Sequence, residues 1–433
     1  MSTTFASLSI PNYRTYFTGF TVSNIGQWMA RTAQAWLVLV TLTDGNASAL
    51  GYLTALTFLP ALLLSPLAGM LADRFPKRTI MVTAAVVLGF NAALLATLVL
   101  TGNVKLWHVF AIAFVDGIAG AFDMPARQAF VSEVVPLRSL PNAISLNSAS
   151  FNSARLLGPG IAGVLIAAFD TGIVLALNVF SFVALIVSLA MLKSDLLHPA
   201  PAAKGRGQLK EGLRYVKGRP DLLVLLTIAF MMGSFGFNFA ISNALMSTET
   251  FGKGPGEYGA LGSFMGLGAF AASLLAAHRA RPRLRYVLGA LGGFTIAMAF
   301  SAVAPSFWMF AMLQIPIGLF AVTAMVTSNA LVQTSIAPEM RGRVMSLWGA
   351  VLLGGTPFVS PVIGWIGDAF GPRWTVVVPA AAIGLTFVLI TTLVMRNDGL
   401  RLRFDTSERT PHLRIVRRSL TPVDVPEPTP LSA

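Results

Sequence analysis

The stretch Gly69-Met70-Leu71-Ala72-Asp73-Arg74-Phe75-Pro76-Lys77-Arg78 decides the fold of this chain. It separates two long apolar runs, 49–71 and 79–101, so that one acid and three bases share a very short polar connection. Each run is long enough to cross a bilayer, which takes about 20 mainly apolar residues. Short basic loops next to hydrocarbon stay on the cytoplasmic side. The stretch therefore predicts a cytoplasmic loop between two membrane spans.

The composition of the whole chain also indicates a membrane protein. Of its 433 residues, 55 % are hydrophobic and 11 % are charged, whereas soluble proteins have about 25 % charged residues. The chain has no cysteine, and its four His residues are scattered, so it offers no disulfide and no metal-ligand spacing. It also lacks a phosphate-binding loop and a hydrolase motif. We expect a protein that is not an enzyme and has no metal and no cofactor.

Hydropathy predicts twelve membrane spans. Six runs lie near 14–41, 49–72, 79–101, 107–127, 141–168 and 172–192, and six near 221–247, 256–277, 286–304, 307–332, 343–369 and 373–395. We therefore predict an all-α membrane protein with two six-helix bundles, residues 1–192 and 221–395. A cytoplasmic linker at 193–220 joins the bundles, and a basic, Pro-rich cytoplasmic tail follows at 396–433.

The two polar segments outside the bundles differ in expected structure. Residues 208–219 of the linker combine apolar and basic side chains, and we expect a short amphipathic helix on the membrane surface. The tail after Arg396 is rich in Arg and Pro, and we expect it to be disordered. Neither segment contains an apolar run, so neither crosses the membrane.

The basic residues fall mainly on one side of the predicted spans. Of the 31 Lys and Arg residues, 26 lie on the face that carries both termini, three lie on the other face, and Arg31 and Arg155 lie inside spans. This asymmetry predicts a multi-pass protein of the cell membrane with both termini in the cytoplasm. It also accounts for the net charge of +13 without nucleic acid as a partner. The expected surroundings are the lipid bilayer, in which we expect a monomer.

The two halves of the chain repeat each other weakly. Ala72-Asp73-Arg74 aligns with Ala277-His278-Arg279, and Gln128 aligns with Gln333, both at an offset of 205 residues. Repeated six-span halves, related by an axis along the membrane normal, are typical of major facilitator transporters.

From about residue 10 to residue 395, the chain resembles the major facilitator superfamily. The loop from Gly69 to Arg78 is similar to the superfamily signature Gly-x-Leu-Ala-Asp-Arg-x-Gly-Arg-Lys, with Pro76 where glycine is usual. Gly158-Pro159-Gly160-Ile161-Ala162-Gly163 resembles the span 5 signature of antiporters and exporters, although Ala154 replaces its leading glycine. The resemblance implies the major facilitator fold, with two pseudo-symmetric bundles.

Shorter motifs resemble one group within the superfamily. Asn12-Tyr13-Arg14, Asp123 to Gln128 and Asn142 to Arg155 are similar to the enterobactin-exporter-like, or transmembrane secretion effector, group. That group resembles macrolide and multidrug exporters. The resemblance does not identify a substrate.

The loop between spans 2 and 3 contains a candidate gate. Asp73 lies at the carboxyl end of a helix, where the macrodipole disfavours an anion, so it needs a partner. We expect Arg127 or the exposed amides at the start of span 11 to supply that partner. The resemblance implies that this loop steadies the state closed to the cytoplasm; a solvated carboxylate that only contributes to topology is the alternative. The gate motif comprises Gly69, Asp73, Arg74, Arg78 and Arg127.

Two opposite charges lie at the same depth in different spans. Arg31 in span 1 and Asp116 in span 4 are both roughly 14 Å below the outer face, at about 1.5 Å per residue. Charges inside a membrane are costly and mark functional sites. We expect Asp116 to load and release a proton while Arg31 or the substrate competes for it. A structural ion pair is the alternative.

Arg155 is a third charge inside a span, so it must face a cavity or a partner. Asp123, Glu133 and Asp116 are the candidate partners. Just beyond it, Gly158, Pro159 and Gly163 form the antiporter-like motif. Small residues and a proline either serve helix packing alone or bend span 5 to seal a leak path during transport.

Amides and aromatic residues in spans 1, 7 and 10 could line a substrate cavity. The candidates for this cavity are Gln27, Trp28, Gln34, Asn238, Gln314 and Asn329, with Trp36, Phe235, Phe237, Asn243 and Gln333 beside them. Such a lining suits large, amphipathic, partly aromatic ligands. Lipid contact or helix packing is the alternative for any single aromatic residue.

These features predict a secondary transporter that works by alternating access. We expect proton-coupled efflux of a small amphipathic compound, drug-like or siderophore-like, with protons as the coupling ion. An uptake carrier or facilitator of the same fold is the alternative. A membrane enzyme or a receptor would need a catalytic constellation or a sensor domain, and the sequence contains neither.

Overall fold

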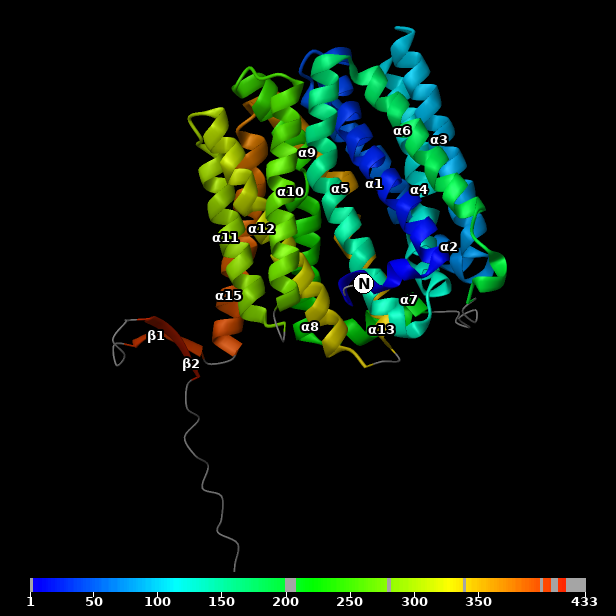
Figure 1. Cartoon of the computed structure of the whole chain (residues 1–433). Coiled ribbons are helices and arrows are strands. Elements are labelled where there is room, and N and C mark those ends of the chain that lie inside the picture. The colour runs from blue at the N-terminus through cyan, green and yellow to red at the C-terminus, as the bar shows by residue number, and fades with distance from the viewer. Residues whose placement is uncertain are drawn as a thin grey trace, which may run out of the picture.

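The computed structural model describes residues 3–198, 208–278, 282–337, 340–397, 400–405 and 412–417, apart from some side chains within these ranges. Long helices make up nearly all of the described chain (Figure 1). The N-terminal half contains η1 (Thr3–Ser9), α1 (Pro11–Trp36), η2 (Leu37–Leu42), α2 (Ala47–Arg74), α3 (Lys77–Leu100), α4 (Leu106–Val134), η3 (Leu137–Ser139), α5 (Leu140–Ala168) and α6 (Thr171–Ala190).

The rest of the described chain contains one connecting segment, a second set of long helices and two short strands. The connecting segment has η4 (Ser194–Leu196) and α7 (Gln208–Lys217). The C-terminal half has α8 (Pro220–Met231), η5 (Met232–Gly236), α9 (Phe239–Leu245), η6 (Met246–Thr250), α10 (Pro255–His278), α11 (Leu284–Ala302), α12 (Phe307–Ser335), α13 (Arg341–Gly354), α14 (Thr356–Phe370) and α15 (Trp374–Asn397), followed by β1 (Leu400–Asp405) and β2 (His412–Arg417).

The helices confirm the predicted membrane fold. Within the described residues, 11 helical segments are long and apolar enough to cross a membrane. The first span, α1 continued by η2, is absent from that set because its 26-residue helix contains amides and two arginines. With α1 included, the described part of the chain has twelve segments of spanning length, which is the number predicted.

Spans 7 and 11 differ from the continuous helices predicted from hydropathy. Span 7 changes from α8 through η5 to α9 near Gly233, and span 11 breaks between α13 and α14 at Gly355. A Cβ at Gly233 would lie 1.7 Å from the backbone oxygen of Leu352, so only glycine lets the two spans approach this closely. The Thr356 hydroxyl donates to the freed Gly233 carbonyl at 2.9 Å, which satisfies a backbone group inside the membrane.

The two ends of the helix bundle are distinguished by the chain connections they carry. The terminal end carries the start of α1, the connections 75–76 and 135–139, helix α7 and the C-terminal strands (Figure 1). The distal end carries the connections 43–46, 101–105, 169–170, 251–254, 303–306 and 371–373.

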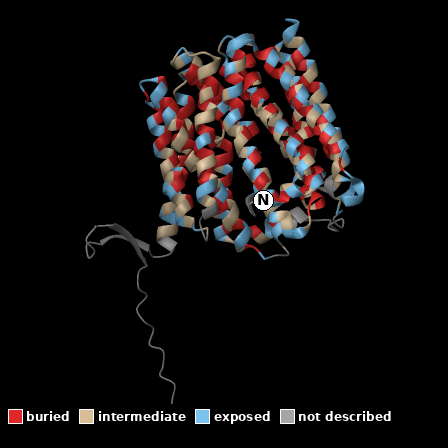
Figure 2. Ribbon diagram, in the orientation of Figure 1, coloured by how far each residue is buried: buried red, intermediate tan, exposed pale blue. Residues whose placement is uncertain are grey.

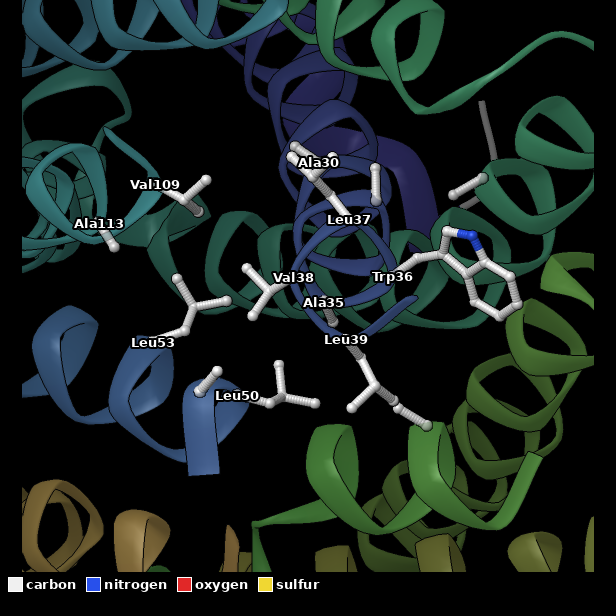
Figure 3. Packing of buried hydrophobic residues seen from close by; sticks show 14 of the residues in the cluster. Ala30, Ala35, Trp36, Leu37, Val38, Leu39, Leu50, Leu53, Val109 and Ala113 are labelled. Carbon is white, nitrogen blue, oxygen red and sulfur yellow. The ribbon is translucent and has the colours of Figure 1, made fainter. Parts of the chain in front are cut away.

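The hydrophobic cores show where the halves join. One cluster at the distal end combines Leu39 and Leu50 of the N-terminal half with Ile241 and Ile363 of the C-terminal half. Figure 3 shows part of it, with the Trp36 ring pointing away from Leu37 and Val38. At the terminal end, the described core clusters are instead separate, one in each half.

Many exposed residues lie on the outer faces of the helices (Figure 2), and a number of them are large and apolar. Phe90 on α3 is 67 % exposed and Phe180 on α6 is 70 % exposed. Apolar surface of this extent is expected where lipid covers the protein. The chain is therefore built as an integral membrane protein.

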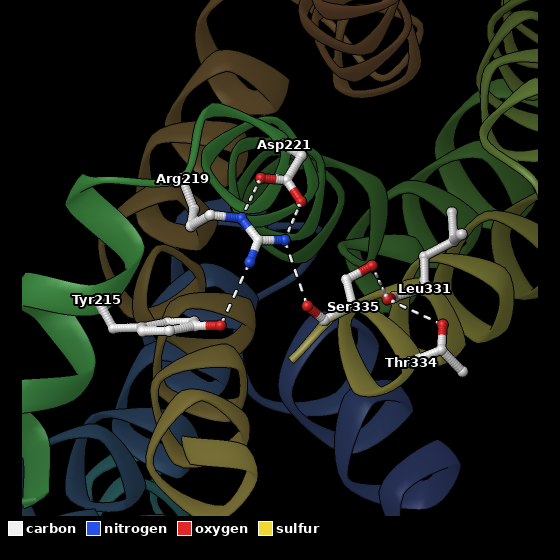
Figure 4. A network of polar contacts seen from close by, with 6 residues as sticks. All are labelled: Tyr215, Arg219, Asp221, Leu331, Thr334 and Ser335. Carbon is white, nitrogen blue, oxygen red and sulfur yellow. Dashed lines mark hydrogen bonds and ion pairs between the residues drawn. The ribbon is translucent and has the colours of Figure 1, made fainter. Parts of the chain in front are cut away.

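The connecting segment contains the expected short helix. It forms as α7 (Gln208–Lys217) and packs against α13, where Gly212 approaches Arg343. Arg219 follows α7 and donates to both carboxylate oxygens of Asp221 at 2.8 and 2.6 Å, to the Tyr215 hydroxyl and to the Ser335 carbonyl (Figure 4). This network ties α7 to α8 and to the end of α12.

The expectation of a fully disordered tail is wrong for residues 400–405 and 412–417. These segments form β1 and β2, which pair antiparallel from Leu400 opposite Arg417 to Asp405 opposite His412. Alternating apolar and basic residues, as in Leu400-Arg401-Leu402-Arg403-Phe404, favour a strand. The remainder of the tail lies outside the described residues.

Candidate substrate and proton site

The span 5 motif forms a close contact between the halves at the distal end. A Cβ at Gly163 would lie 2.6 Å from the Pro255 carbonyl oxygen on α10. A Cβ at Gly259 would lie 2.4 Å from the Pro159 carbonyl oxygen on α5. The backbones of α5 and α10 therefore touch, which larger side chains would prevent. Gly158 faces the other way, toward Trp28 of α1.

A second contact between the halves joins α2 to α14. The Asp368 carboxylate of α14 accepts hydrogen bonds from the backbone N–H groups of Ala47 and Ser48, at 2.7 and 2.9 Å, and from the Ser48 hydroxyl. These N–H groups begin α2, where the helix dipole favours an anion. Gly51 and Gly364 let the two backbones approach. We call the α5–α10 and α2–α14 contacts together the distal seam.

The same helices separate toward the terminal end. There α5 exposes Phe151 to 45 % and Ile144 to 52 %, and α2 exposes Leu63 to 64 %. An added Cβ at Gly69 of α2, or at Gly342 of α13, would meet nothing within 4 Å. In this conformation, the halves are thus closed at the distal end and apart at the terminal end.

The basic residues of the loop between α2 and α3 hold the N-terminal half together. Lys77 forms an ion pair with Glu133 of α4 at 3.0 Å. Arg78 donates to the Ala190 carbonyl at the end of α6 and to the Ser194 hydroxyl, both at 3.0 Å. Both partners belong to the same half or the segment that follows it. Sequence reasoning did not find these contacts.

The predicted gate contact between Asp73 and Arg127 is not described in this structure. The Asp73 side chain lies outside the described residues, as does that of His278. Arg127 pairs with Asp123 of the same helix at 2.6 Å, and its guanidinium lies 5.2 Å from the centre of the Phe20 ring. Among the described side chains, the partner of Arg127 is therefore Asp123. The gate role stays a prediction, and Arg74 is exposed.

Arg31 and Asp116 lie near each other inside the N-terminal half. They interact electrostatically, yet among the described residues they form no ion pair. The Asp116 carboxylate instead accepts a hydrogen bond from the Asn91 amide of α3 at 2.8 Å. The structural ion pair weighed as an alternative is thus absent here. Asn91 is a partner that sequence reasoning missed, because nothing in the sequence pairs α3 with α4 at that level.

Arg155 has a different partner from the three acids predicted for it. Asp123 is paired with Arg127, Glu133 is paired with Lys77, and Asp116 is bonded to Asn91. The Arg155 guanidinium lies 5.8 Å from the centre of the Trp28 ring, and Arg31 lies 5.3 Å from the same point. Trp28 also contacts Phe151 edge-on, with ring centres 5.8 Å apart. Two cations therefore share one aromatic ring.

The amides predicted to line a cavity have different surroundings. Asn238 is buried and bonded to the Ser234 carbonyl and the Ser360 hydroxyl, both at 2.6 Å, so its amide serves the junction of η5 and α14. Gln314 is also buried, and its Oε1 has no hydrogen-bond partner in the described structure. Two other pairs are local: Gln27 donates to the Ser23 hydroxyl, and Gln333 donates to Asn329.

Gln34 and Trp28 of α1 are both partly exposed. Trp36 stacks on Tyr258 of α10 at 5.9 Å, and it lines a pocket at the distal end with Gly45, Glu249 and Lys253. Phe235 and Phe237 pack on the core of the C-terminal half, and Asn243 is buried there. The predicted cavity amides that keep some exposure thus lie on α1 and α12, and Gln333 on α12 is the exposed one among them.

The fold matches that of solved membrane transporters. A bacterial homolog of the human lysosomal transporter Spinster, in an inward-facing and unoccupied conformation, has a TM-score of 0.69 with this chain at 16 % identity. The match covers 89 % of this chain and 98 % of that one. Together with the twelve-span pattern, this likeness shows that the chain has the major facilitator fold.

The family follows from the sequence itself. The model of the transmembrane secretion effector family matches residues 2–414. The chain belongs to this family, as its motifs predicted, and the family consists of membrane transporters, which are not enzymes. It is accordingly an integral protein of the cell membrane.

Two relatives illustrate the range of the family. The staphyloferrin A transporter of Staphylococcus aureus is 24 % identical over 394 residues, which cover 88 % of this chain and 96 % of that protein. Macrolide efflux protein A of Streptococcus pyogenes is 23 % identical over 330 residues, which cover 73 % of this chain and 80 % of that protein.

Proposed function

We propose that this transporter exports a small amphipathic compound in exchange for protons. The observation that carries the proposal is Asp116, a carboxylate inside a membrane span with Arg31 close by and without an ion pair. A relative named for macrolide efflux and the antiporter-like motif at Gly158 support export. The compound is drug-like or siderophore-like, and the protein acts as a monomer.

The distribution of basic residues supports an orientation for this cycle. It favours an orientation in which the terminal end lies in the cytoplasm. The distal seam then closes the outer side, and the separated terminal end opens to the cytoplasm. Rocking of the two halves would break the seam and bring Gly69 and Gly342, which now face open space, into a contact at the terminal end.

Asp116 is proposed to carry the proton. Its Oδ1 accepts a hydrogen bond from the Asn91 amide, and its negative charge interacts electrostatically with Arg31. Protonation from the outer side would neutralise the Asp116 carboxylate and remove its electrostatic attraction for Arg31. Loss of the proton to the cytoplasm would restore it. The proton thus enters as the substrate leaves.

A second candidate is uptake of an anionic compound together with a proton. One observation favours it: Arg31 and Arg155 outnumber the acid near them. A proton on Asp116 would make this region more positive and would strengthen its hold on an anion. Proton and anion would then bind to the same state, as cotransport requires, instead of excluding one another.

Transport by purified protein in liposomes tests both candidates. Dyes, macrolides and siderophores are loaded, and an imposed pH gradient is applied in either direction. Exchange requires substrate to move against the proton flux, whereas cotransport requires movement with it. Movement that ignores the gradient would contradict both and leave a facilitator.

Asp116→Asn tests the role of the carboxylate. The amide keeps the size of the side chain and can still accept the Asn91 hydrogen bond, so we expect normal insertion and complete loss of gradient-driven transport. Asp170→Asn is the matched control, since Asp170 only caps the start of α6 at the distal end. Full gradient-driven transport by Asp116→Asn would disprove the role.

A further inference from the structure

Arg155 has an unused hydrogen-bonding capacity inside the membrane. Among the described residues, no carboxylate pairs with it, and its Nε atom is buried without a hydrogen-bond partner. A guanidinium has five N–H donors in a fixed planar fork. A buried donor without an acceptor is unfavourable, so an acceptor that binds to the Arg155 guanidinium would stabilise this region.

Arg31 brings a second guanidinium to the same place. The two guanidinium carbons lie 5.3 and 5.8 Å from one ring centre, that of Trp28, so they are at most about 11 Å apart. Like charges this close in a membrane protein repel each other unless an anion lies between or beside them. The Trp28 ring attracts each cation, but it carries no net charge and cannot neutralise either.

The nearest acid does not neutralise the pair. Asp116 interacts with Arg31 without an ion pair and is hydrogen-bonded to Asn91. An anion can therefore bind beside Arg31 without displacing an existing ion pair. With Asp116 ionised, the group still has one more positive charge than negative.

The surroundings provide room and an apolar surface. Arg31 is exposed, and on α5 Phe151 is 45 % exposed and contacts Trp28 edge-on. Ser148, one turn before Phe151, is also exposed. The accessible face continues toward the terminal end, where the halves are apart. A planar apolar group can thus lie against Trp28 and Phe151 while its charged group reaches the guanidinia.

We infer that Arg31 and Arg155, arranged around Trp28, bind the carboxylate or a similar planar oxyanion of an amphipathic, partly aromatic compound. This rests on the proposed transport function and holds for either direction of transport. Arginine suits the role because its fork matches a carboxylate bidentately. The unmatched positive charge makes a cationic compound a poor ligand.

The position of Arg155 links this site to the movement of the halves. A Cβ at Gly266 of α10 would lie 3.0 Å from the Arg155 carbonyl oxygen, so the Arg155 backbone sits at the edge of the distal seam. Gly158 leaves room for Trp28, because a Cβ there would lie 2.6 Å from the Trp28 Cβ. Opening the seam would change the surroundings of both, and affinity for the anion would change with it.

Binding of two xanthene dyes to the purified full chain in lipid nanodiscs tests the inference. Carboxyfluorescein is anionic and rhodamine 123 is cationic, while their ring systems are alike. Fluorescence anisotropy without any gradient is expected to show at least tenfold tighter binding of carboxyfluorescein. Arg155→Gln and Arg31→Gln are each expected to weaken it at least tenfold, and Arg155→Lys to weaken it less.

Arg373→Gln is the control, because that guanidinium donates only to the Ala302 and Ala304 carbonyls at the distal end. Thermal unfolding verifies that each variant is folded. If Arg155→Gln does not fold, the binding of carboxyfluorescein by Arg31→Gln decides the test. The inference is wrong if rhodamine 123 binds as tightly as carboxyfluorescein, if neither dye binds, or if the decisive folded variant binds carboxyfluorescein unchanged.

The two proposals can fail separately. Binding is measured without a gradient, so anion binding that survives Asp116→Asn while gradient-driven transport is absent from the unmodified protein would contradict only the proposed function. Gradient-driven transport without an anion preference would contradict only this inference.

Discussion

The distal seam and the loop between α2 and α3 lie at opposite ends of α2 and make different kinds of contact. At the seam, α2 begins under Asp368 of the other half. At the loop, α2 ends and the neighbouring bases Lys77 and Arg78 bind α4, α6 and the segment after it. One end of α2 is therefore joined across the halves, and the other is surrounded by contacts within one half.

The two regions therefore have different roles: the loop between α2 and α3 stabilises one half, whereas the distal seam holds the two halves together. The loop bases keep the N-terminal half rigid in the state seen here. The seam joins the halves through glycine backbones and a few hydrogen bonds, beside the apolar cluster that both halves share. A rigid half and a breakable seam are what alternating access needs.

Gly163→Ala is expected to have the largest effect, because it places a Cβ 2.6 Å from the Pro255 carbonyl oxygen. Overpacking of this kind costs about 1–3 kcal/mol, which shifts the ratio of distal-closed to distal-open protein roughly five- to 150-fold. The chain has no cysteine, so spin labels on Leu42→Cys and Lys253→Cys would report the widening. Gly289→Ala is the control, since a Cβ there meets nothing within 4 Å. An unchanged label distance in Gly163→Ala would show that the seam is not tight.

Gly69→Ala is expected to act in the opposite direction. The added Cβ meets nothing within 4 Å in this conformation, so the distal-closed state is unaffected, while closure of the terminal end becomes harder. We expect transport to fall by up to about tenfold and label distances at the distal end to stay short. Transport at the unmodified rate would mean that Gly69 does not pack in the other state.

Asp368→Asn should weaken the seam less. The amide keeps an acceptor but loses the negative charge at the start of α2, which is worth about 0.3–1 kcal/mol at an exposed helix terminus. A shift of a few fold toward the distal-open state should appear in the same label distances. Asp170→Asn makes the same change at the start of α6 within one half and should leave the ratio alone. Equal shifts in both variants would argue against a special role for Asp368.

Lys77→Gln should leave the ratio of the two states nearly unchanged. Its ion pair with Glu133, with side chains 13 % and 9 % exposed, lies inside one half. We expect a loss of stability of about 1 kcal/mol, seen as a lower melting temperature in nanodiscs. Lys77→Arg should restore most of it. A large change in the label distances would show instead that the loop already acts on the second half.

Sequence reasoning predicted the helices better than the breaks in them. The apolar runs predicted twelve spans, since span length follows from the thickness of the bilayer. Hydropathy did not predict the breaks near Gly233 and Gly355, because these glycines are required by contacts between spans that are distant in the sequence. The tail strands were missed as well, although the alternation at Leu400 to Phe404 was visible in the sequence.

The sequence named candidate residues but not their partners. Arg31, Asp116 and Arg155 stood out as charges inside apolar runs, and Trp28 was a candidate cavity residue; their roles stay predictions. Their partners were not predicted, because Asn91 and Trp28 meet them through the rotation of whole helices. Asp368 was also missed as a contact between the halves, although the sequence shows an acid at the end of span 11.

The sequence by itself determined the spans, the side of the membrane on which the basic loops are expected, and the family. These depend on the local length and polarity of each segment. Only the tertiary structure decided that Arg155 lies against Trp28, that Asp116 bonds to Asn91 and that the halves close at the distal end. Such contacts depend on how far each helix is rotated and tilted against its neighbours, and no local pattern specifies that.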